Sequence, residues 1–163
     1  LNNGIYLEEE LINSRKTDFC IGVAGYPEKH FEAPNMQTDL AFLKAKVDAG
    51  ADYIVTQMFF DNAKYYAFVE ACRANGINVP IVPGLKPIYN KKQLTVLPKI
   101  FSIDLPQDLS NEVAKCKNNA DVEKVGEDWL LEQSRDLKKN GVPGLHYYTL
   151  GKPGIVANVI NRM

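Results

Sequence analysis

The chain has 163 residues, of which 45% are hydrophobic and 24% carry a charge, and its formal net charge is -1 at pH 7. This length and composition are typical of one globular, soluble domain. The nearly neutral charge gives no electrostatic reason to expect nucleic acid or an anionic membrane as a partner. Three widely spaced cysteines and two distant histidines form no metal-binding spacing and no disulfide framework. We therefore expect no metal site and a reducing, cytoplasmic setting.

No apolar run approaches the roughly 20 residues of a membrane-spanning helix, and no secretory signal opens the chain. Apolar residues at helical spacing predict a short amphipathic helix over residues 5–15. The sequence opens with Leu1 rather than with an initiator methionine. We therefore expect it to be part of a longer protein.

Four stretches rich in β-branched and aromatic residues predict buried strands. The clearest is the second, in which a helix that stops at Gly50 precedes a nearly continuous apolar run with the amide of Gln57 near its end. The order helix, glycine, strand is typical of a parallel sheet covered by helices. The predicted strands span residues 19–24, 53–60, 79–87 and 144–150.

Amphipathic helices are predicted after each strand, because apolar residues recur there at helical spacing. Pro106, Leu109 and Val113 predict one or two further helices, inserted before the last strand. The expected N-caps are Asn35, Asp61, Asn90 and Asp121, the expected helix ends lie near Ala49, Gly76, Pro98 and Gly141, and a terminal helix is expected around residues 155–160.

These elements make four βα units in a single domain, residues 1–163, of the α/β class. Two architectures have this pattern: a small doubly wound sheet, or half of an eight-stranded barrel. The segment from Gly22 to Gly25 is too short, and has the wrong pattern, for a glycine-rich phosphate loop. Together with the expected missing beginning, this favours the half-barrel.

Candidate functional groups follow the predicted strands, because ligands of parallel sheets bind at the carboxyl ends of strands. They include hydrogen-bond donors, aromatic rings and one histidine, but no nucleophile–base pair and no paired carboxylates. This mixture suits a polar aromatic ligand better than covalent hydrolysis. The residues are Tyr26, Glu28 and His30 after the first strand, Gln57 and Asp61 after the second, Lys86 after the third, and Tyr148, Thr149 and Lys152 after the fourth.

Structural explanations also exist for several of these residues. A tyrosine or a histidine at a strand end needs no ligand, the Gln57 amide can be bonded internally, and Lys46, late in its helix, can complement the helix dipole. Lys86 has a second chemical interpretation, because a desolvated lysine at a barrel strand end can form a Schiff base. Tyr147 and Tyr148 alternate in direction along the last strand, so one of them faces the barrel interior or its rim.

Four stretches in collinear order resemble one family. They are VAGYPEKHFEA, TDLAFLKAKVDAGADYIVTQMFFD, GINVPIVPGLKPI and GLHYYTLGKP, and the similarity runs from about Phe19 to Lys152. The family is methylenetetrahydrofolate reductase, whose members are flavin-bearing (β/α)8 TIM barrels. They pass a hydride from NADH or NADPH through FAD to 5,10-methylenetetrahydrofolate and release 5-methyltetrahydrofolate. The resemblance implies that this chain supplies roughly the last four βα units of such a barrel.

Site residues also follow from the resemblance. Asp39 and Lys46 would reach the adenosine and phosphate side of the cofactor, where a lysine is a suitable charge partner for a diphosphate. The Gln57 amide can pair with donor and acceptor edges of a pterin at once. The implied FAD residues are Tyr26, His30, Ala33, Asp39, Lys46 and Ala51, and the implied folate residues are Gln57, Gln93, Tyr148 and Lys152.

Four positions depart from the family pattern. Leu97 stands where bacterial relatives place a phenylalanine that stacks on folate, and Lys152 replaces an arginine, which removes a bidentate contact to a carboxylate. Phe42 and Ala45 replace polar residues near the adenine end of FAD. These changes leave the details of folate stacking and of the adenine site open.

The resemblance also implies what the chain lacks. The family's acid–base glutamate would precede Leu1, so no catalytic residue is expected in this chain. Alone, the chain is expected to be inactive and to bind FAD weakly, whereas the full-length protein is expected to be a homo-oligomer. From the residues alone, a Schiff-base lyase or aldolase that uses Lys86 and a non-catalytic α/β binding module remain as alternatives.

Overall fold

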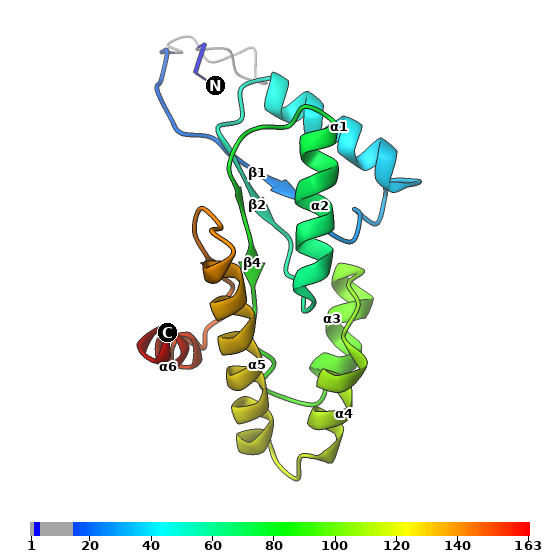
Figure 1. Cartoon of the computed structure of the whole chain (residues 1–163), viewed down its shortest axis with the longest axis vertical. Helices are drawn as coiled ribbons and strands as arrows, with labels where there is room; N and C mark the ends of the chain where they lie inside the picture. Colours follow the sequence, from blue (N-terminus) through cyan, green and yellow to red (C-terminus); the bar gives the residue numbers. More distant parts are fainter. Residues whose placement is uncertain (1, 4–14) are drawn as a thin grey trace.

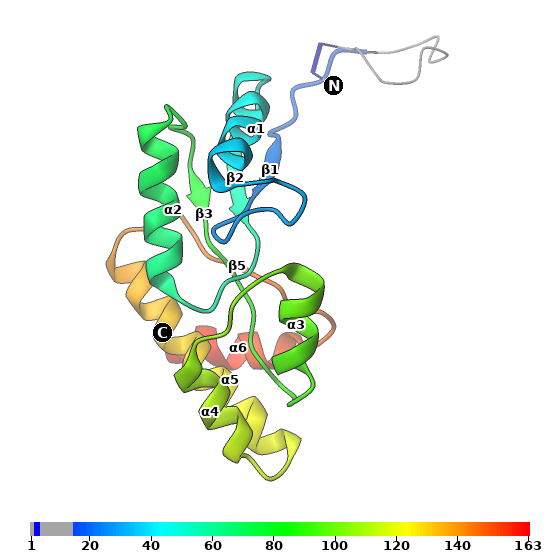
Figure 2. The same ribbon diagram turned by 90° about the vertical axis from the view of Figure 1, so that its right-hand side faces the viewer.

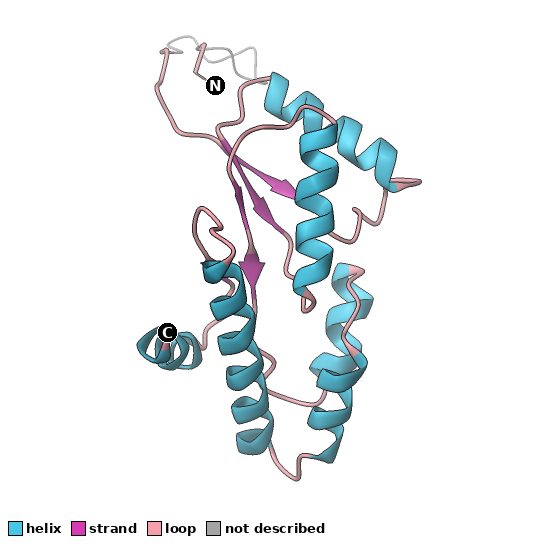
Figure 3. Cartoon of the chain, viewed as in Figure 1, coloured by secondary structure: helices cyan, strands magenta, loops and turns pink. Residues whose placement is uncertain are grey.

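The computed structural model describes residues 2–3 and 15–163, so the helix expected over residues 5–15 lies almost wholly outside the described residues. The described part consists of short strands and longer helices, which alternate up to β3 and again from β5 to α6 (Figures 1 and 3). No helix in this part is long and apolar enough to cross a membrane. The elements are β1 (Gly22–Gly25), α1 (Met36–Asp48), β2 (Tyr53–Thr56), α2 (Asn62–Ala74), β3 (Ile81–Val82), β4 (Gly84–Leu85), α3 (Gln93–Phe101), α4 (Gln107–Lys115), α5 (Asn119–Lys139), β5 (His146–Tyr147) and α6 (Pro153–Arg162).

All strand pairs among the described residues are parallel. β1, β2 and β3 form one sheet in chain order, and β4 and β5 form a second. Gly22 pairs with Tyr53 at the start of β1, and Gly25 pairs with Thr56 at its end. Within each sheet the strand order follows the chain order, without the reversal that a doubly wound sheet requires. The predicted α/β class with parallel strands is therefore confirmed.

The prediction of one strand over residues 79–87 is wrong. β3 pairs with β2, whereas β4, one residue further on, pairs with β5. Pro83 separates β3 from β4, because proline has no N–H to continue a ladder of hydrogen bonds. The next N–H, that of Gly84, donates to the Thr56 hydroxyl at 2.9 Å. A side chain thus connects the two sheets where backbone pairing stops.

The other predicted strands are shorter than expected. β1 begins at Gly22 rather than at residue 19, β2 ends at Thr56 rather than at residue 60, and β5 has only His146 and Tyr147. The apolar residues after β2 are nevertheless buried: Met58 is 3% exposed, and Phe60 is 1% exposed. Apolar runs here predicted burial correctly and strand pairing incorrectly.

Two predicted helix starts are confirmed. The Asn35 side chain accepts a hydrogen bond from the Thr38 N–H at 2.9 Å, and Asp61 accepts one from the Ala63 N–H at 2.9 Å. Each side chain satisfies an N–H that has no partner inside the helix. α1 and α2 therefore begin at the ends of their preceding loops as the sequence predicts.

Two other helix starts differ from the prediction. α5 is capped by Asn118, whose side chain accepts from the Asp121 N–H at 3.0 Å, so Asp121 lies inside the first turn. Its carboxylate there complements the positive end of the helix dipole. Asn90 bonds the Gln93 N–H at 3.2 Å, but α3 has Lys92 as its N-cap, without a side-chain cap.

The helices cover one face of the three-stranded sheet. Ile54 and Ile81 on that face are at most 1% exposed and pack with apolar residues of α1, α2, α5 and α6. α1 and α2 run beside β1–β3 in both views (Figures 1 and 2). On the opposite face Ala24 is exposed, and Val55 and Val82 are half-buried. Parallel sheets are usually covered on both faces, so this second face is open within the described part.

A second core lies where α3, α4 and α5 meet the loops that follow β2 and β4. Leu97 of α3 is 3% exposed there, packed among apolar side chains. Gly126 brings α5 directly against the chain at Ile88, because a Cβ at position 126 would meet the Ile88 carbonyl oxygen. The helix inserted before β5 is thereby fixed against the loop that leaves β4.

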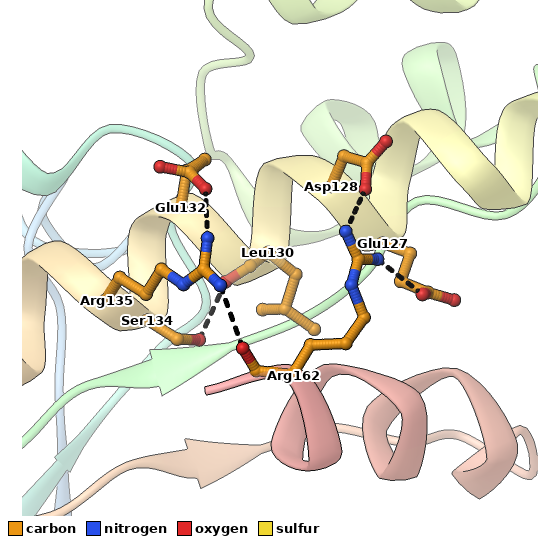
Figure 4. Close-up of polar contacts among 7 residues, drawn as sticks. All are labelled: Glu127, Asp128, Leu130, Glu132, Ser134, Arg135 and Arg162. Carbon is orange, nitrogen blue, oxygen red and sulfur yellow. Dashed lines mark hydrogen bonds and ion pairs between the residues drawn. The ribbon is translucent and has the colours of Figure 1, made fainter.

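α6 is held on α5 by a set of ion pairs at its end. The Arg162 guanidinium contacts Glu127 at 2.7 Å and Asp128 at 2.8 Å, and the Arg162 carbonyl accepts from Arg135 at 2.8 Å (Figure 4). These groups are partly exposed, so each pair contributes little alone. Together with Val156 and Val159 in the core, they hold the helix that begins after Lys152.

We expect Gly126→Ala to lower the free energy of unfolding by about 1–3 kcal/mol, because a methyl group there would overpack the contact with Ile88. Gly154→Ala in α6 is the matched control, since a Cβ at position 154 meets nothing within 4 Å. The control should be neutral or slightly stabilising. Urea unfolding of both variants measures the difference, and equal stabilities would contradict the close approach of α5 to Ile88.

Candidate functional site

A cavity of about 260 Å³ opens between the loop after β1 and helix α1. The loop turns back on the helix because the Asp39 carboxylate accepts a hydrogen bond from the His30 N–H at 2.8 Å. Five of the six residues that the family resemblance implied for FAD therefore come together here. The lining residues are Tyr26, His30, Glu32, Ala33, Asp39, Phe42 and Lys46.

Two aromatic rings form one wall of this cavity. Tyr26 and His30 meet edge to face, with ring centroids 4.5 Å apart. Burial, followed by the negative charges of Asp39 and Glu32, raises the pKa of Tyr26. The phenol therefore stays protonated at neutral pH and can donate a hydrogen bond to a ligand.

Lys46 does more than complement the dipole of α1. Its ammonium group crosses to the neighbouring strand and donates to the Ala24 carbonyl oxygen at 3.0 Å. No carboxylate in the described part of the chain forms an ion pair with it. The cavity thus has an exposed cation at its edge that is available to an anionic group.

Ala51 lies apart from the other implied FAD residues. It is 7% exposed and lies between α1 and β2, and it is not among the residues that line the cavity. Its N–H donates to the Lys46 carbonyl oxygen at 3.3 Å. The structure does not bring Ala51 to the cavity lining, and its role in FAD binding stays a prediction.

Gln57 and Tyr148 form a second group at the carboxyl ends of the strands. The Tyr148 hydroxyl donates to the carbonyl oxygen of Thr56 at 2.9 Å, next to Gln57 in the chain. Tyr147 points the other way, toward α5, where its hydroxyl bonds Ser134 at 3.0 Å. The structure therefore assigns Tyr148, rather than Tyr147, to the open face of the sheet.

The two groups adjoin each other. The Gln57 N–H donates to the Gly25 carbonyl oxygen at 2.8 Å, one residue before Tyr26. Burial is the main cause that raises the pKa of Tyr148, and the nearby Tyr26 phenol raises it further. A ligand in contact with Tyr26 can thus also reach the Gln57–Tyr148 group.

Tyr89 connects the remaining implied folate residues and was not identified from the sequence. Its N–H donates to Gln93 Oε1 at 2.8 Å. The Lys152 ammonium lies 4.8 Å from the centre of its ring, and the Lys86 ammonium lies 4.5 Å from it. Such distances are typical of cation–π contacts. The position of Tyr89, just after β4, was a signal of the kind that identified the other candidates.

Lys86 is buried, with an exposed fraction of 1%. Its ammonium donates to the Pro87 carbonyl oxygen at 3.2 Å and otherwise faces the Tyr89 ring. Burial lowers the pKa of Lys86 to about 8. Lys152 differs, because it is exposed and forms an ion pair with Glu123 at 2.5 Å.

Three other residues at strand ends have structural partners. Glu28 is bonded to the Lys64 ammonium and to the Asp104 N–H, both at 2.7 Å, which ties the β1 loop to α2 and to the α3–α4 loop. Asp61 caps α2. The carbonyl oxygen of Thr149 accepts from the Lys152 N–H at 2.9 Å. These residues shape the strand ends through bonds within the chain.

The arrangement is suited to binding. Tyrosine hydroxyls, amides, one imidazole and lysine ammoniums line the strand ends, where they can hold a polar ring system with an anionic group. Within the described residues, no three histidine, cysteine, aspartate or glutamate side chains are grouped to hold a metal ion.

Comparison with known proteins gives a consistent family. The family model for methylenetetrahydrofolate reductase matches residues 8–163. A probable methylenetetrahydrofolate reductase (NADPH) of Caenorhabditis elegans is 37% identical over 147 residues, covering 89% of this chain and 22% of that protein. The 5,10-methylenetetrahydrofolate reductase of Pectobacterium carotovorum is 40% identical over 136 residues, covering 83% of this chain and 46% of that protein. The chain thus spans less than half the length of these relatives.

A solved structure has a similar fold. It is an uncharacterized protein from Clostridium thermocellum, described as binding two copies of 5-methyl-5,6,7,8-tetrahydrofolic acid. The TM-score is 0.56 at 20% identity, over 88% of this chain and 52% of that one. At this identity the likeness concerns the fold alone. The family model covers nearly the whole sequence, and on that ground the chain belongs to the methylenetetrahydrofolate reductase family.

Proposed function

We propose that this chain is the part of a flavin-dependent reductase that holds FAD and folate, in an enzyme that reduces 5,10-methylenetetrahydrofolate to 5-methyltetrahydrofolate with NADH or NADPH. The observation that carries the proposal is the convergence of Tyr26, His30, Ala33, Asp39 and Lys46 on one cavity. Family membership supports the same reaction. FAD supplies the hydride chemistry, and the protein orients the reactants.

The residues of the cavity fit part of an FAD molecule. The cavity volume of about 260 Å³ is suitable for a portion of the cofactor rather than for all of it. Asp39 can accept from ribose hydroxyls, and the exposed ammonium of Lys46 can pair with a phosphate. Ala33 is 5% exposed and its small side chain leaves room for a ring or a ribose. The exposed Phe42 adds an apolar surface at the edge of the cavity.

The neighbouring group suits a pterin. Among the described residues, the Gln57 side chain bonds only the adjacent Met58 N–H, at 3.3 Å, through its oxygen, so its amide N–H groups are available to an acceptor. Gln93 uses its oxygen to bond the Tyr89 N–H, and no residue in the described part of the chain accepts from its side-chain N–H groups. The FAD cavity and the Gln57–Tyr148 group adjoin at Tyr26 and Tyr148. A nicotinamide and a folate that each contact the flavin would therefore occupy the same space, one after the other.

We also propose that the described strands form part of the wall of a (β/α)8 barrel. The open face of the β1–β3 sheet supports this, since a barrel covers that face with its other strands. Sequential parallel strands with helices on one side are the arrangement that a barrel wall needs. Assembly of the full-length protein as a homo-oligomer and a cytoplasmic setting stay predictions.

In the full-length protein, Lys46→Ala is expected to weaken FAD binding about 10-fold, because it removes the cation that can pair with a phosphate. Lys44→Ala is the matched control: Lys44 lies on the same helix, outside the cavity lining, and pairs with Asp48. Flavin fluorescence titration measures both dissociation constants. Equal affinities in the two variants would contradict the assignment of this cavity to FAD.

Gln57→Ala is expected to raise KM for 5,10-methylenetetrahydrofolate about 10-fold while FAD affinity stays the same, because the lost amide would bond only the pterin. Gln37→Ala, an exposed glutamine of α1, is the control and should leave both quantities unchanged. Steady-state kinetics and flavin titration provide the two measurements. A loss of FAD affinity with unchanged KM would place Gln57 in the cofactor site instead.

A further inference from the structure

Within the described part of the chain, Lys86 is a buried cation without an anionic partner. Its exposed fraction is 1%, yet its ammonium has only one hydrogen-bond acceptor, the Pro87 carbonyl oxygen. An ammonium group has three N–H donors, so two remain unsatisfied among the described residues. Burial is the sole cause of its lowered pKa, because no carboxylate in the described part lies close enough to raise it again. A buried charge in this state destabilises the unliganded protein.

The nearest groups concentrate positive charge further. Tyr89 presents its ring to the ammoniums of both Lys86 and Lys152. Of the two lysines, only Lys152 pairs with a carboxylate of the described residues, that of Glu123. Lys86, Tyr89 and Lys152 are here called the lysine–tyrosine cluster. It has two positive charges, of which Glu123 neutralises one.

The cluster lies at the same strand ends as the other candidate binding residues. Tyr89 bonds Gln93, and Lys86 lies two residues after Gly84, so both extend from the carboxyl end of β4. Side chains alternate in direction along a strand. The Lys86 side chain therefore lies on the same face as Gly84, opposite to Leu85, which packs on the helices. The Tyr148 ring lies on that same face, where a Cβ on Gly84 would meet it.

We propose that the lysine–tyrosine cluster is a binding site for an anionic oxygen group of a ligand, with Lys86 as a residue that contacts it directly. The inference rests on the proposed function, because it adds a residue to the same site. The ligand group is a carboxylate or a phosphate: a folate ends in a carboxylate, and a nicotinamide nucleotide has phosphates. Lysine is a point charge with rotatable donors and can serve either.

The proposal explains why a destabilising lysine is tolerated at this position. Methionine has nearly the same reach and would be apolar, so it would satisfy burial without the cost of desolvating a charge. In the absence of ligand, Lys86→Met is therefore expected to raise Tm in the full-length protein. A Tm of Lys86→Met below that of the wild type would indicate that the Lys86 ammonium has an anionic partner.

The pH dependence of stability also tests whether Lys86 is buried without an anionic partner, because a lowered pKa determines whether stability rises or falls with pH. Between pH 8 and about 10.5 the unfolded chain keeps a proton on Lys86 that the folded protein has lost. Stability of the wild type should therefore rise with pH across this window relative to Lys86→Met. The difference between the two proteins isolates Lys86 from the tyrosines that also titrate at high pH. A constant difference in Tm from pH 7.5 to pH 9.5 would contradict the lowered pKa.

The decisive test measures ligand affinity in the full-length protein for wild type, Lys86→Met and Lys92→Met. Lys92 is an exposed lysine of the same loop and serves as the control. The ligands are 5-methyltetrahydrofolate, 6-methyltetrahydropterin, which has the pterin without the carboxylates, and the oxidised nicotinamide nucleotides. Lys86→Met should weaken one anionic ligand about 10- to 100-fold, as expected for a hydrogen bond to a charged group, and leave 6-methyltetrahydropterin unchanged.

The outcomes distinguish the two sources of the anion. A loss confined to 5-methyltetrahydrofolate identifies a carboxylate, and a loss confined to the nucleotides identifies a phosphate. Unchanged affinity for all ligands, or an equal loss for 6-methyltetrahydropterin, overturns the proposal. If Lys86→Met does not fold, Lys86→Gln provides the same comparison with a neutral polar side chain. If the wild type binds neither FAD nor folate, the proposed function fails first and this inference fails with it.

Discussion

Thr56 is the junction on which the arrangement of the strand ends depends. It is fully buried, and it bonds both β4 and the end of β5. Its hydroxyl accepts from the Gly84 N–H, and its carbonyl oxygen accepts from the Tyr148 hydroxyl, each at 2.9 Å. Because Pro83 interrupts backbone pairing, these two bonds connect the β1–β3 sheet to the β4–β5 sheet. They thereby position Gln57 and Tyr148 beside each other.

Much of the fold follows from local sequence patterns. Asn35 and Asp61 are side chains that satisfy helix N–H groups within three residues, so their role as caps needs no tertiary information. The apolar segments predicted parallel strands because each one lies between two amphipathic helices, an order that the sequence itself shows. The grouping of Tyr26, His30 and Lys46 at one cavity came from the family resemblance, and periodicity alone left each of them with a structural explanation.

Other features depend on contacts that no local pattern contains. The break at Pro83 reflects a choice of partner strand, which is settled by residues more than 60 positions further along the chain. Tyr89 gains its importance from Lys152, which reaches it from the start of α6. The burial of Lys86 likewise depends on the fold, since the sequence shows only apolar neighbours. The cap of α5 is Asn118 rather than the predicted Asp121, because both residue types suit a cap and lie within one turn of each other.

The central claim is that these strand ends bring a flavin, a nicotinamide and a folate to one place. Anaerobic absorbance spectroscopy of the full-length protein loaded with FAD tests it most directly. We expect the visible absorbance of the oxidised flavin to fall on addition of NADH or NADPH and to return on addition of 5,10-methylenetetrahydrofolate. Failure of the protein to bind FAD, or absorbance that falls and does not return with the folate, would contradict it.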